Sequence, residues 1–308
     1  MANYLPEGMR IDLPANRRAL SSLAALQEAQ AQGSILEGRA VICDSGHNLV
    51  VELGALRGLI PREEGALGIA EGTTRDIALI SRVNKPVCFK VTGFGPGPDG
   101  VFMPQLSRRL AQQECMDRYL SQLVPGDILN AKVTHLEPFG CFVDIGCGIP
   151  SLIPIDAISV SRISHPRDRF QPGQQIKAVV KAVEPGGRIC LSHKELWGTW
   201  AENAALFTPG ETVAGIVRSV EEYGVFVELT PNLAGLAEPR PGVAPGQHAS
   251  VYIKSLIPQR MKVKLILVDA FEAAYRPAPP PYFLTAGHIS RWRYSPACAS
   301  RVIETVFD

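Results

Sequence analysis

The sequence lacks the features that mark membrane, secreted and disordered proteins. No run approaches the ~20 consecutive apolar residues of a transmembrane helix, and the opening MANYLPEGMRIDLPANRR has no apolar core of a secretion signal. Charged residues make up only 20% of the chain and hydrophobic residues 46%, so the charge-rich composition of disordered chains is absent too. We therefore expect a folded protein of the cytoplasm.

Cysteine pairs and catalytic motifs are also missing. The seven cysteines are scattered without a CxxC pair, which argues against a disulfide framework or a zinc ribbon and predicts reduced thiols. No phosphate-binding glycine loop, HExxH or GxSxG motif occurs. His135 and His193 could act as general bases, but neither has a carboxylate partner recognisable in the sequence. We expect a protein that is not an enzyme and needs no cofactor or metal.

The chain has almost no excess of either charge. Lys and Arg total 31 against 30 for Asp and Glu, which gives a formal net charge of +1. This balance is weak support for a protein that binds a polyanion, because such proteins usually carry a basic surface. Any nucleic-acid contact must therefore rest on local groups of positive charge.

What the sequence does contain is an internal repeat, which decides the architecture. The segment PGDILNAKVTHLEPFGCFVDIGCGIPSLIP, from Pro125, aligns without a gap with PGETVAGIVRSVEEYGVFVELTPNLAGLAE, from Pro209, and matching residues lie 84 apart. A weaker copy from Gly38 to Pro61 places VVELG opposite FVDIG. The chain therefore holds three related units.

Each unit is predicted to be a small β-barrel. Short runs of alternating apolar and polar residues, separated by Gly and Pro turns, indicate five strands per unit. Five such strands leave unpaired edges unless they close, as they do in the OB fold. Runs of period 3.6 from Ser107, from Ser192 and from about Asn16 to Ala31 predict helices. The fold class is mainly β: three tandem five-stranded OB-fold barrels joined by short helices, with an N-terminal helix.

The middle unit resembles the RNA-binding domain of ribosomal protein S1, which polynucleotide phosphorylase shares. The family signature G-x-V, FGxFV, GLxxxS, PG-x-x-V and GRIxLS is matched by PGDILNAKV, FGCFVDIG, SLIPIDAIS, PGQQIKAVV and GRICLS. The three-unit layout, roughly residues 34 to 270, resembles the shorter multi-repeat bacterial S1-like proteins. This resemblance implies a non-catalytic protein that binds single-stranded RNA such as mRNA, works with the ribosome or translation, and has the small ribosomal subunit rather than a membrane as its partner.

With the resemblance, the chain is predicted to comprise seven segments: an N-terminal helical extension (1–33), a degenerate OB-fold repeat (34–106), a helical connector (107–123), an OB-fold RNA-binding repeat (124–193), a second helical connector (194–207), a second OB-fold RNA-binding repeat (208–270) and a C-terminal extension (271–308).

The resemblance also implies which side chains contact RNA. The family's two base-stacking aromatics fall on Phe139 and Phe142, and on Tyr223 and Phe226 in the last unit. From spacing alone, one aromatic of each pair could instead fill the barrel, since most aromatics are core residues. The first unit has no aromatic at these positions, so we interpret it as a docking or spacer module.

Cations complete the predicted interface. The family's fifth-strand Arg falls on Arg188 and, allowing one inserted residue, on Lys262; Lys132 and Lys264 are the other candidates. The family's third-strand His is replaced by Pro154 in the middle unit, and by Glu238 in the last unit.

Three further questions stay open. The basic loop SVSRISHPRDRF, with Arg162, Arg167 and Arg169, could face phosphates or be a solvated charge cluster. The segment HISRWRYSP could stack on nucleic acid or form an edge strand on the last barrel. The whole chain could also be a scaffold that docks on the ribosome or on an RNA-decay enzyme.

Overall fold

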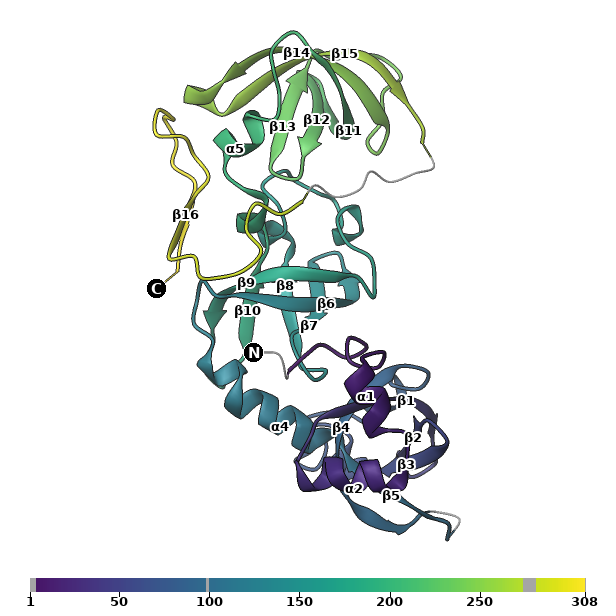
Figure 1. The fold of residues 1–308 in the computed structure, drawn as a ribbon. Coiled ribbons are helices and arrows are strands. Elements are labelled where there is room, and N and C mark those ends of the chain that lie inside the picture. The colour runs from purple at the N-terminus through teal and green to yellow at the C-terminus, as the bar shows by residue number, and fades with distance from the viewer. Residues whose placement is uncertain (1–3, 98–99, 274–280, 308) are drawn as a thin grey trace. The chain divides into compact units, whose positions relative to one another are not determined.

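Three closed five-stranded barrels make up most of the chain (Figure 1). The computed structural model describes residues 4–97, 100–273 and 281–307. The mainly β architecture with few helices confirms the fold class predicted from the repeat. No helix among the described residues combines the length and the apolar character that crossing a membrane requires.

All three barrels use one strand plan. The strands are β1 (Leu36–Cys43), β2 (Leu49–Leu53), β3 (Leu56–Ile60), β4 (Pro86–Pro96) and β5 (Phe102–Ser107) in the first barrel; β6 (Ile128–Glu137), β7 (Gly140–Asp144), β8 (Pro150–Pro154), β9 (Gln175–Val183) and β10 (Ile189–Ser192) in the middle barrel; and β11 (Thr212–Glu221), β12 (Gly224–Thr230), β13 (Leu233–Ala237), β14 (His248–Ile257) and β15 (Lys262–Phe271) in the last barrel.

The third and fifth strands of each barrel pair in parallel, and this pairing closes the sheet on itself. It joins Leu59 to Gln105 in the first barrel. It joins Leu152 to Cys190 in the middle barrel and Leu236 to Lys264 in the last. Closure removes the exposed edges that a five-stranded sheet would otherwise have.

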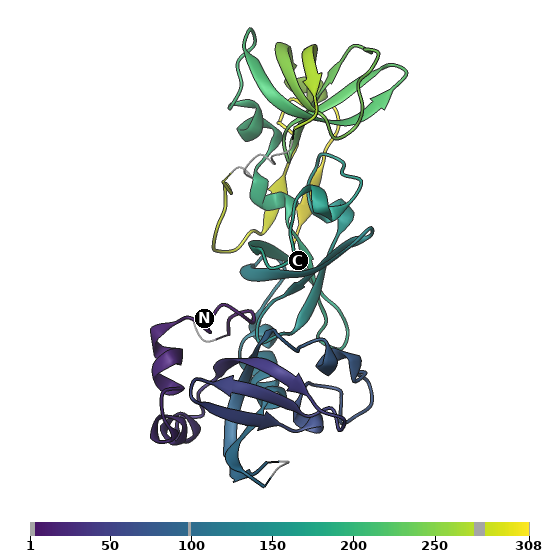
Figure 2. The ribbon, with the colours of Figure 1, turned by 90° about the vertical axis from the view of Figure 1, so that its right-hand side faces the viewer.

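The predicted helices are present, but two of them are interrupted. The N-terminal helix is two helices, α1 (Pro14–Ala19) and α2 (Leu23–Ala31), because Ser22 caps α2 by accepting from the amide of Ala25. Both lie beside the strands of the first barrel (Figure 2). The run from Ser192 gives the short helix η5 (Lys194–Trp197) and then α5 (Trp200–Ala204), because Gly198 between them has φ +77°.

The helix predicted from Ser107, in the connector after the first barrel, is continuous as expected. Ser107 caps α4 (Arg108–Arg118) by accepting from the amide of Leu110. The remaining helices are one-turn elements: α3 (Ile77–Ile80), η1 (Arg62–Glu64), η2 (Leu120–Gln122), η3 (Ile155–Ala157), η4 (Pro166–Asp168) and η6 (Pro258–Arg260).

The chain divides into two compact units, each described by itself below. Unit 1 holds residues 1–123, 130–132 and 144–150, and unit 2 holds residues 124–129, 133–143 and 151–308. In unit 1 the core of the first barrel is formed by fully buried side chains, among them Leu49, Ile60, Phe89 and Leu106.

In unit 2 the C-terminal residues join the core. β16 (Arg291–Arg293) pairs with β17 (Glu304–Val306) as a separate ribbon. Trp292 and Tyr294 are buried in the cluster that includes the last barrel's core, and the Tyr294 hydroxyl donates to the Asn232 carbonyl at 2.5 Å. Buried rings cannot stack on RNA, so that interpretation of HISRWRYSP is wrong. The segment does form a short strand that packs in the cluster of the last barrel's core, although it pairs with β17 and not with the barrel sheet.

The basic loop of the middle barrel is a packing element of unit 2. The Arg169 side chain is only 4% exposed; it donates to Glu228 of β12 at 2.5 Å and lies 5.9 Å from the centre of the Trp197 ring. Arg218 of β11 donates to the same carboxylate at 2.8 Å. For Arg169, the phosphate-facing and solvated interpretations are therefore both wrong, whereas Arg162 is exposed.

Asn232, in the hairpin between β12 and β13, fixes the same region. Its amide is fully buried: the oxygen accepts from the Val160 amide at 3.0 Å, and the nitrogen donates to the carbonyls of Lys194 and Gly198 at 2.7 and 2.8 Å. A buried side-chain amide is stable only when such bonds are made. The hairpin of the last barrel is thus held by the loop and connector of the middle repeat.

We expect Glu228→Ala to lower the free energy of unfolding of unit 2 by about 3 kcal/mol, because it removes the carboxylate that pairs with the buried Arg169 and leaves Arg218 only the longer contact with Asp168, at 3.7 Å. Urea titration followed by tryptophan fluorescence measures this directly, since Trp197, Trp200 and Trp292 all lie in unit 2. Glu222→Ala, an exposed carboxylate between β11 and β12, is the matched control. Equal unfolding midpoints for the two variants would contradict the prediction.

Candidate nucleic-acid interface

Two aromatic pairs with the same geometry lie on the surfaces of the middle and last barrels. Phe139 is 56% exposed and Tyr223 is 66% exposed, just before β7 and β12. The Phe139 and Phe142 ring centres are 6.0 Å apart, and those of Tyr223 and Phe226 are 6.1 Å apart, both edge to face. Phe142 and Phe226 are half-buried and lie between buried strand neighbours, so they face outward. The interpretation in which one ring fills the barrel does not hold.

The glycine after each first aromatic explains the position of the pair. A Cβ on Gly140 would lie 2.6 Å from the Ile153 carbonyl oxygen, and one on Gly224 would lie 2.5 Å from that of Ala237. Real Cβ atoms do not approach backbone atoms that closely. Only glycine therefore allows the start of the second strand to pack directly on the backbone of the third strand. The aromatic residue that precedes it is left at the exposed rim of the barrel.

In the last barrel, strand register brings predicted cations to the aromatic pair. Ser219, Phe226, Leu236 and Lys264 are successive cross-strand partners on β11, β12, β13 and β15. Lys264 is exposed at the end of this row, and Lys262 lies two residues earlier on the same face. A stacking ring with ammonium groups beside it suits a single strand of nucleic acid.

The middle barrel has fewer cations on the equivalent strand. Leu152 of the middle barrel pairs with Cys190, and the equivalent Leu236 of the last barrel pairs with Lys264. Cys190 therefore occupies the position of Lys264. Arg188, two residues earlier, occupies the position of Lys262. Arg188 is exposed in the turn before β10.

The residues that replace the family's histidine lie at the ends of the third strands. Pro154 is half-buried at the end of β8, and Glu238 is exposed just after β13. A carboxylate at this position opposes a phosphate. The last barrel thus combines a stronger set of lysines with one unfavourable charge.

His135 borders the middle pair and was not predicted as part of it. Its ring centre lies 6.4 Å from that of Phe142, and its Nε2 lies 2.5 Å from a carboxylate oxygen of Glu137. The repeat offset of 84 residues aligns it with Ser219, but only the structure shows that Ser219 pairs with Phe226. The strands, rather than a sequence motif, bring this residue to the site.

The first barrel has no comparable platform at the equivalent positions. His47, with φ +61°, lies 3.6 Å from Asp76, and Arg62 donates to the same carboxylate at 2.7 and 3.1 Å. Val50 is half-buried. His47, Arg62 and Asp76 hold a loop together, and these positions offer no pair of aromatic rings.

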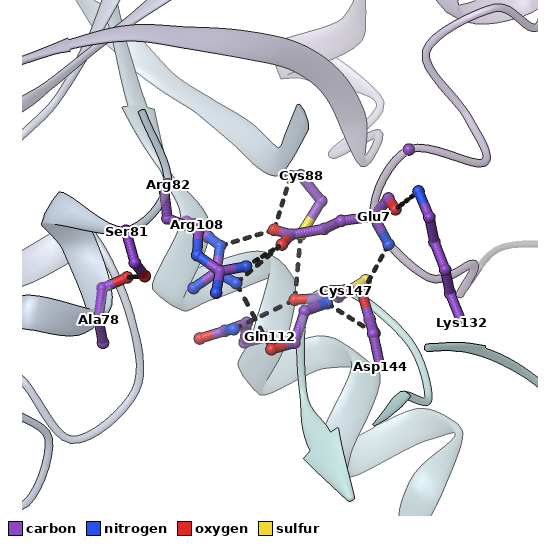
Figure 3. A network of polar contacts seen from close by, with 12 residues as sticks. Glu7, Ala78, Ser81, Arg82, Cys88, Arg108, Gln112, Lys132, Asp144 and Cys147 are labelled. Carbon is purple, nitrogen blue, oxygen red and sulfur yellow. Dashed lines mark hydrogen bonds and ion pairs between the residues drawn. The ribbon is translucent and has the colours of Figure 1, made fainter. Parts of the chain in front are cut away.

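Lys132, a predicted RNA contact, lies in unit 1 and is half-buried. Its ammonium donates to the Glu7 carbonyl at 2.8 Å (Figure 3). The ammonium is therefore held by the N-terminal segment, unlike the exposed Lys262 and Lys264.

Glu7 is the centre of a buried polar network. Its carboxylate accepts from Arg108 at 2.6 and 3.0 Å and from the Cys88 amide at 3.1 Å, and Arg82 lies 3.3 Å away (Figure 3). Burial acts to raise the pKa of Glu7, but the ion pairs and hydrogen bonds lower it overall. The carboxylate thus stays ionised in the interior.

Asp144 extends this network into the hairpin between β7 and β8. It accepts from the amides of Glu7, Gly146 and Gly148 at 2.7, 2.8 and 3.0 Å. Burial and the nearby charge of Glu7 raise the pKa of Asp144 to about 7. The hairpin residues 144–150 accordingly belong to unit 1.

Comparison with known proteins gives a family for part of the chain. Residues 123–194 match the model of the S1 RNA binding domain. The chain is 28% identical over 261 residues to the small ribosomal subunit protein bS1 of Staphylococcus aureus (strain COL), covering 79% of this chain and 64% of the relative. A bS1 homolog of Bacillus subtilis (strain 168) is 39% identical over 119 residues, 38% of this chain and 31% of the relative. The chain thus spans about two thirds or less of these relatives.

Solved structures add little to this comparison. A multidomain protein with nucleic acid binding domains from Streptococcus pneumoniae covers 78% of this chain, with 16% identity and a TM-score of 0.26. GSP13 from Bacillus subtilis covers 23% of this chain, with 25% identity and a TM-score of 0.22.

The raised pKa of Asp144 predicts a pH-dependent stability. The ordinary pKa of an aspartate is 3.8, and that of Asp144 in the folded protein is about 7. Between these two pH values Asp144 stays protonated in the folded protein but is ionised in the unfolded chain, so rising pH lowers the free energy of unfolding. The unfolding free energy of the wild type minus that of Asp144→Asn should therefore fall across this window and then level off. Chemical denaturation at several pH values measures it, with the exposed Asp156→Asn as control. A flat or rising difference would refute the assignment.

Proposed function

We propose that this chain, whose middle barrel is a member of the S1 RNA-binding domain family, is a non-catalytic cytoplasmic protein that binds single-stranded RNA. The observation that carries the proposal is the repeated exposed aromatic pair, Phe139 with Phe142 and Tyr223 with Phe226. Every base has a flat face, so recognition by stacking tolerates many sequences.

Magnitudes favour stacking as the main source of affinity. Each base stacked on an aromatic ring contributes about 1–3 kcal/mol. Phosphate contacts add salt-dependent affinity, but few cations lie on the strand row of each aromatic pair: Arg188 on the middle barrel, and Lys262 and Lys264 on the last. With a net charge of +1, long-range attraction of RNA adds little.

The barrels have different roles in this proposal. The middle barrel binds through its aromatic pair and Arg188, and the last through its pair and its lysines. The first barrel, which has no aromatic pair at the matching strands, is a spacer in this proposal; a docking role for it belongs to the alternative function below. The relatives are small ribosomal subunit proteins, so we propose the small ribosomal subunit as the partner of this chain.

We expect the double variant Phe139→Ala, Phe142→Ala to bind unstructured RNA about tenfold or more weakly, because it removes the middle stacking platform. Fluorescence anisotropy at fixed salt measures the change. Phe102→Ala is the control, since it removes an equally exposed aromatic from the first barrel. Unchanged affinity in a folded double variant would count decisively against this platform.

A protein-docking scaffold is the alternative function. Because docking through the first barrel does not need the stacking rings, only RNA-dependent attachment should respond to their loss. We expect co-sedimentation of the chain with ribosomes to weaken in the double variant and after nuclease digestion of mRNA. Full co-sedimentation under both conditions would favour the scaffold.

A further inference from the structure

The last barrel has an exposed, partly apolar face beyond its aromatic pair, on the ribbon formed by β14 and β15. Tyr252 of β14 pairs with Ile266 of β15, and the two are 37% and 49% exposed. Val268, the next outward residue on β15, is 51% exposed. These side chains lie on the outer side of strands whose alternate residues, such as Ile253 and Leu265, are buried in the core.

The equivalent face is covered in the other two barrels. Helices α2 and α4 pack on β4, and η5 packs on β9, whereas no helix in the described part of the chain packs on β14 to a similar extent. In the middle barrel Val180 makes backbone hydrogen bonds with Gly126 and Asp127. In the last barrel Ile253 makes the matching bonds with Gly210 and Glu211, so Val180 and Ile253 are equivalent positions. Val179 therefore occupies the position of Tyr252, and it is fully buried.

Charge on the ribbon indicates what could cover this face. Lys254, Lys262 and Lys264 are exposed, and none of them pairs with a carboxylate among the residues that the structure describes. Asp269 lies farther along β15, opposite Ser250. An aromatic ring beside several unpaired ammonium groups suits a polyanion with flat apolar bases better than an apolar protein surface.

The face is continuous with the proposed RNA site through Lys264. This residue pairs with Leu236, the neighbour of Phe226, on one side and with Ser255 of β14 on the other. Strand spacings of ~4.8 Å and a two-residue repeat of ~6.8 Å place Tyr252 only ~8 Å from Lys264. Lys264 thus lies between β13, whose Leu236 pairs with Phe226, and β14, which carries Tyr252.

We propose that a single RNA strand stacked on Phe226 continues past Lys264 onto the β14–β15 ribbon, where a base stacks on Tyr252 and Lys254 contacts a phosphate. The inference rests on the proposed function and extends it to a second stacking position in the same barrel. The middle barrel cannot offer this position because Val179 is covered.

The test compares a short and a long RNA. Labelled oligouridylates of about 4 and about 12 nucleotides, within the range that one OB fold occupies, are titrated by anisotropy into the full chain. All proteins carry Phe139→Ala and Phe142→Ala, so that the last barrel dominates. We expect Tyr252→Ala to weaken binding of the long RNA about fivefold or more and of the short RNA less than about twofold, and Tyr252→Phe to restore it.

Two controls separate the possible failures. Phe226→Ala should weaken the binding of both RNAs, and Phe102→Ala should weaken the binding of neither. If Phe226→Ala weakens binding but Tyr252→Ala does not, this inference is overturned and the proposed function stands. If the unmutated chain, titrated alongside, binds neither RNA, both are overturned. Equal loss for both lengths in Tyr252→Ala, with a lower melting temperature, would assign the ring a structural role and overturn the inference.

Discussion

Parallel pairing of the third and fifth strands is the constraint on which the molecule depends. It closes each barrel, and closure fixes the register of all five strands. Register in turn decides which side chains face water, because a shift of one residue would exchange the inner and outer faces. The row from Phe226 through Leu236 to Lys264 exists only because β13 and β15 meet at this register.

Buried ion pairs withdraw three of the 31 basic residues from any ligand. Arg108 is paired with Glu7, and Arg169 and Arg218 share Glu228. Such buried pairs add little net stability, because desolvating the two charges offsets their attraction. Separating the partners would leave a buried charge unpaired and strongly destabilise the fold, so the pairs fix one geometry. The remaining exposed lysines and arginines on two barrels carry the electrostatic part of binding.

The sequence predicts the strands, the barrels and the aromatic pairs well because these are local patterns. Alternation, Pro-Gly turns and the step from an aromatic residue to glycine are visible within a few residues. The roles of Arg169 and Lys132 are not predictable in this way, because their partners lie 59 and 125 residues away.

Tertiary contacts also limit prediction from the repeat. Val179 and Tyr252 occupy one position in two barrels, yet one is buried by a connector and the other is exposed. The repeat shows that the positions correspond, but exposure depends on the segment that packs against each barrel. The N-terminal and second connector helices were likewise predicted as continuous, although a capping serine and a left-handed glycine divide them.

The hairpin between second and third strands has one further consequence. In the middle barrel this hairpin, with Asp144, is bound by the N-terminal segment, and in the last barrel its counterpart, with Asn232, is bound by the connector of the preceding repeat. In both barrels the same hairpin thus grips a segment that comes earlier in the chain. The identity of that segment differs, so a single hairpin position serves two kinds of partner, with Asp144 accepting from the Glu7 amide and Asn232 donating to the Lys194 carbonyl.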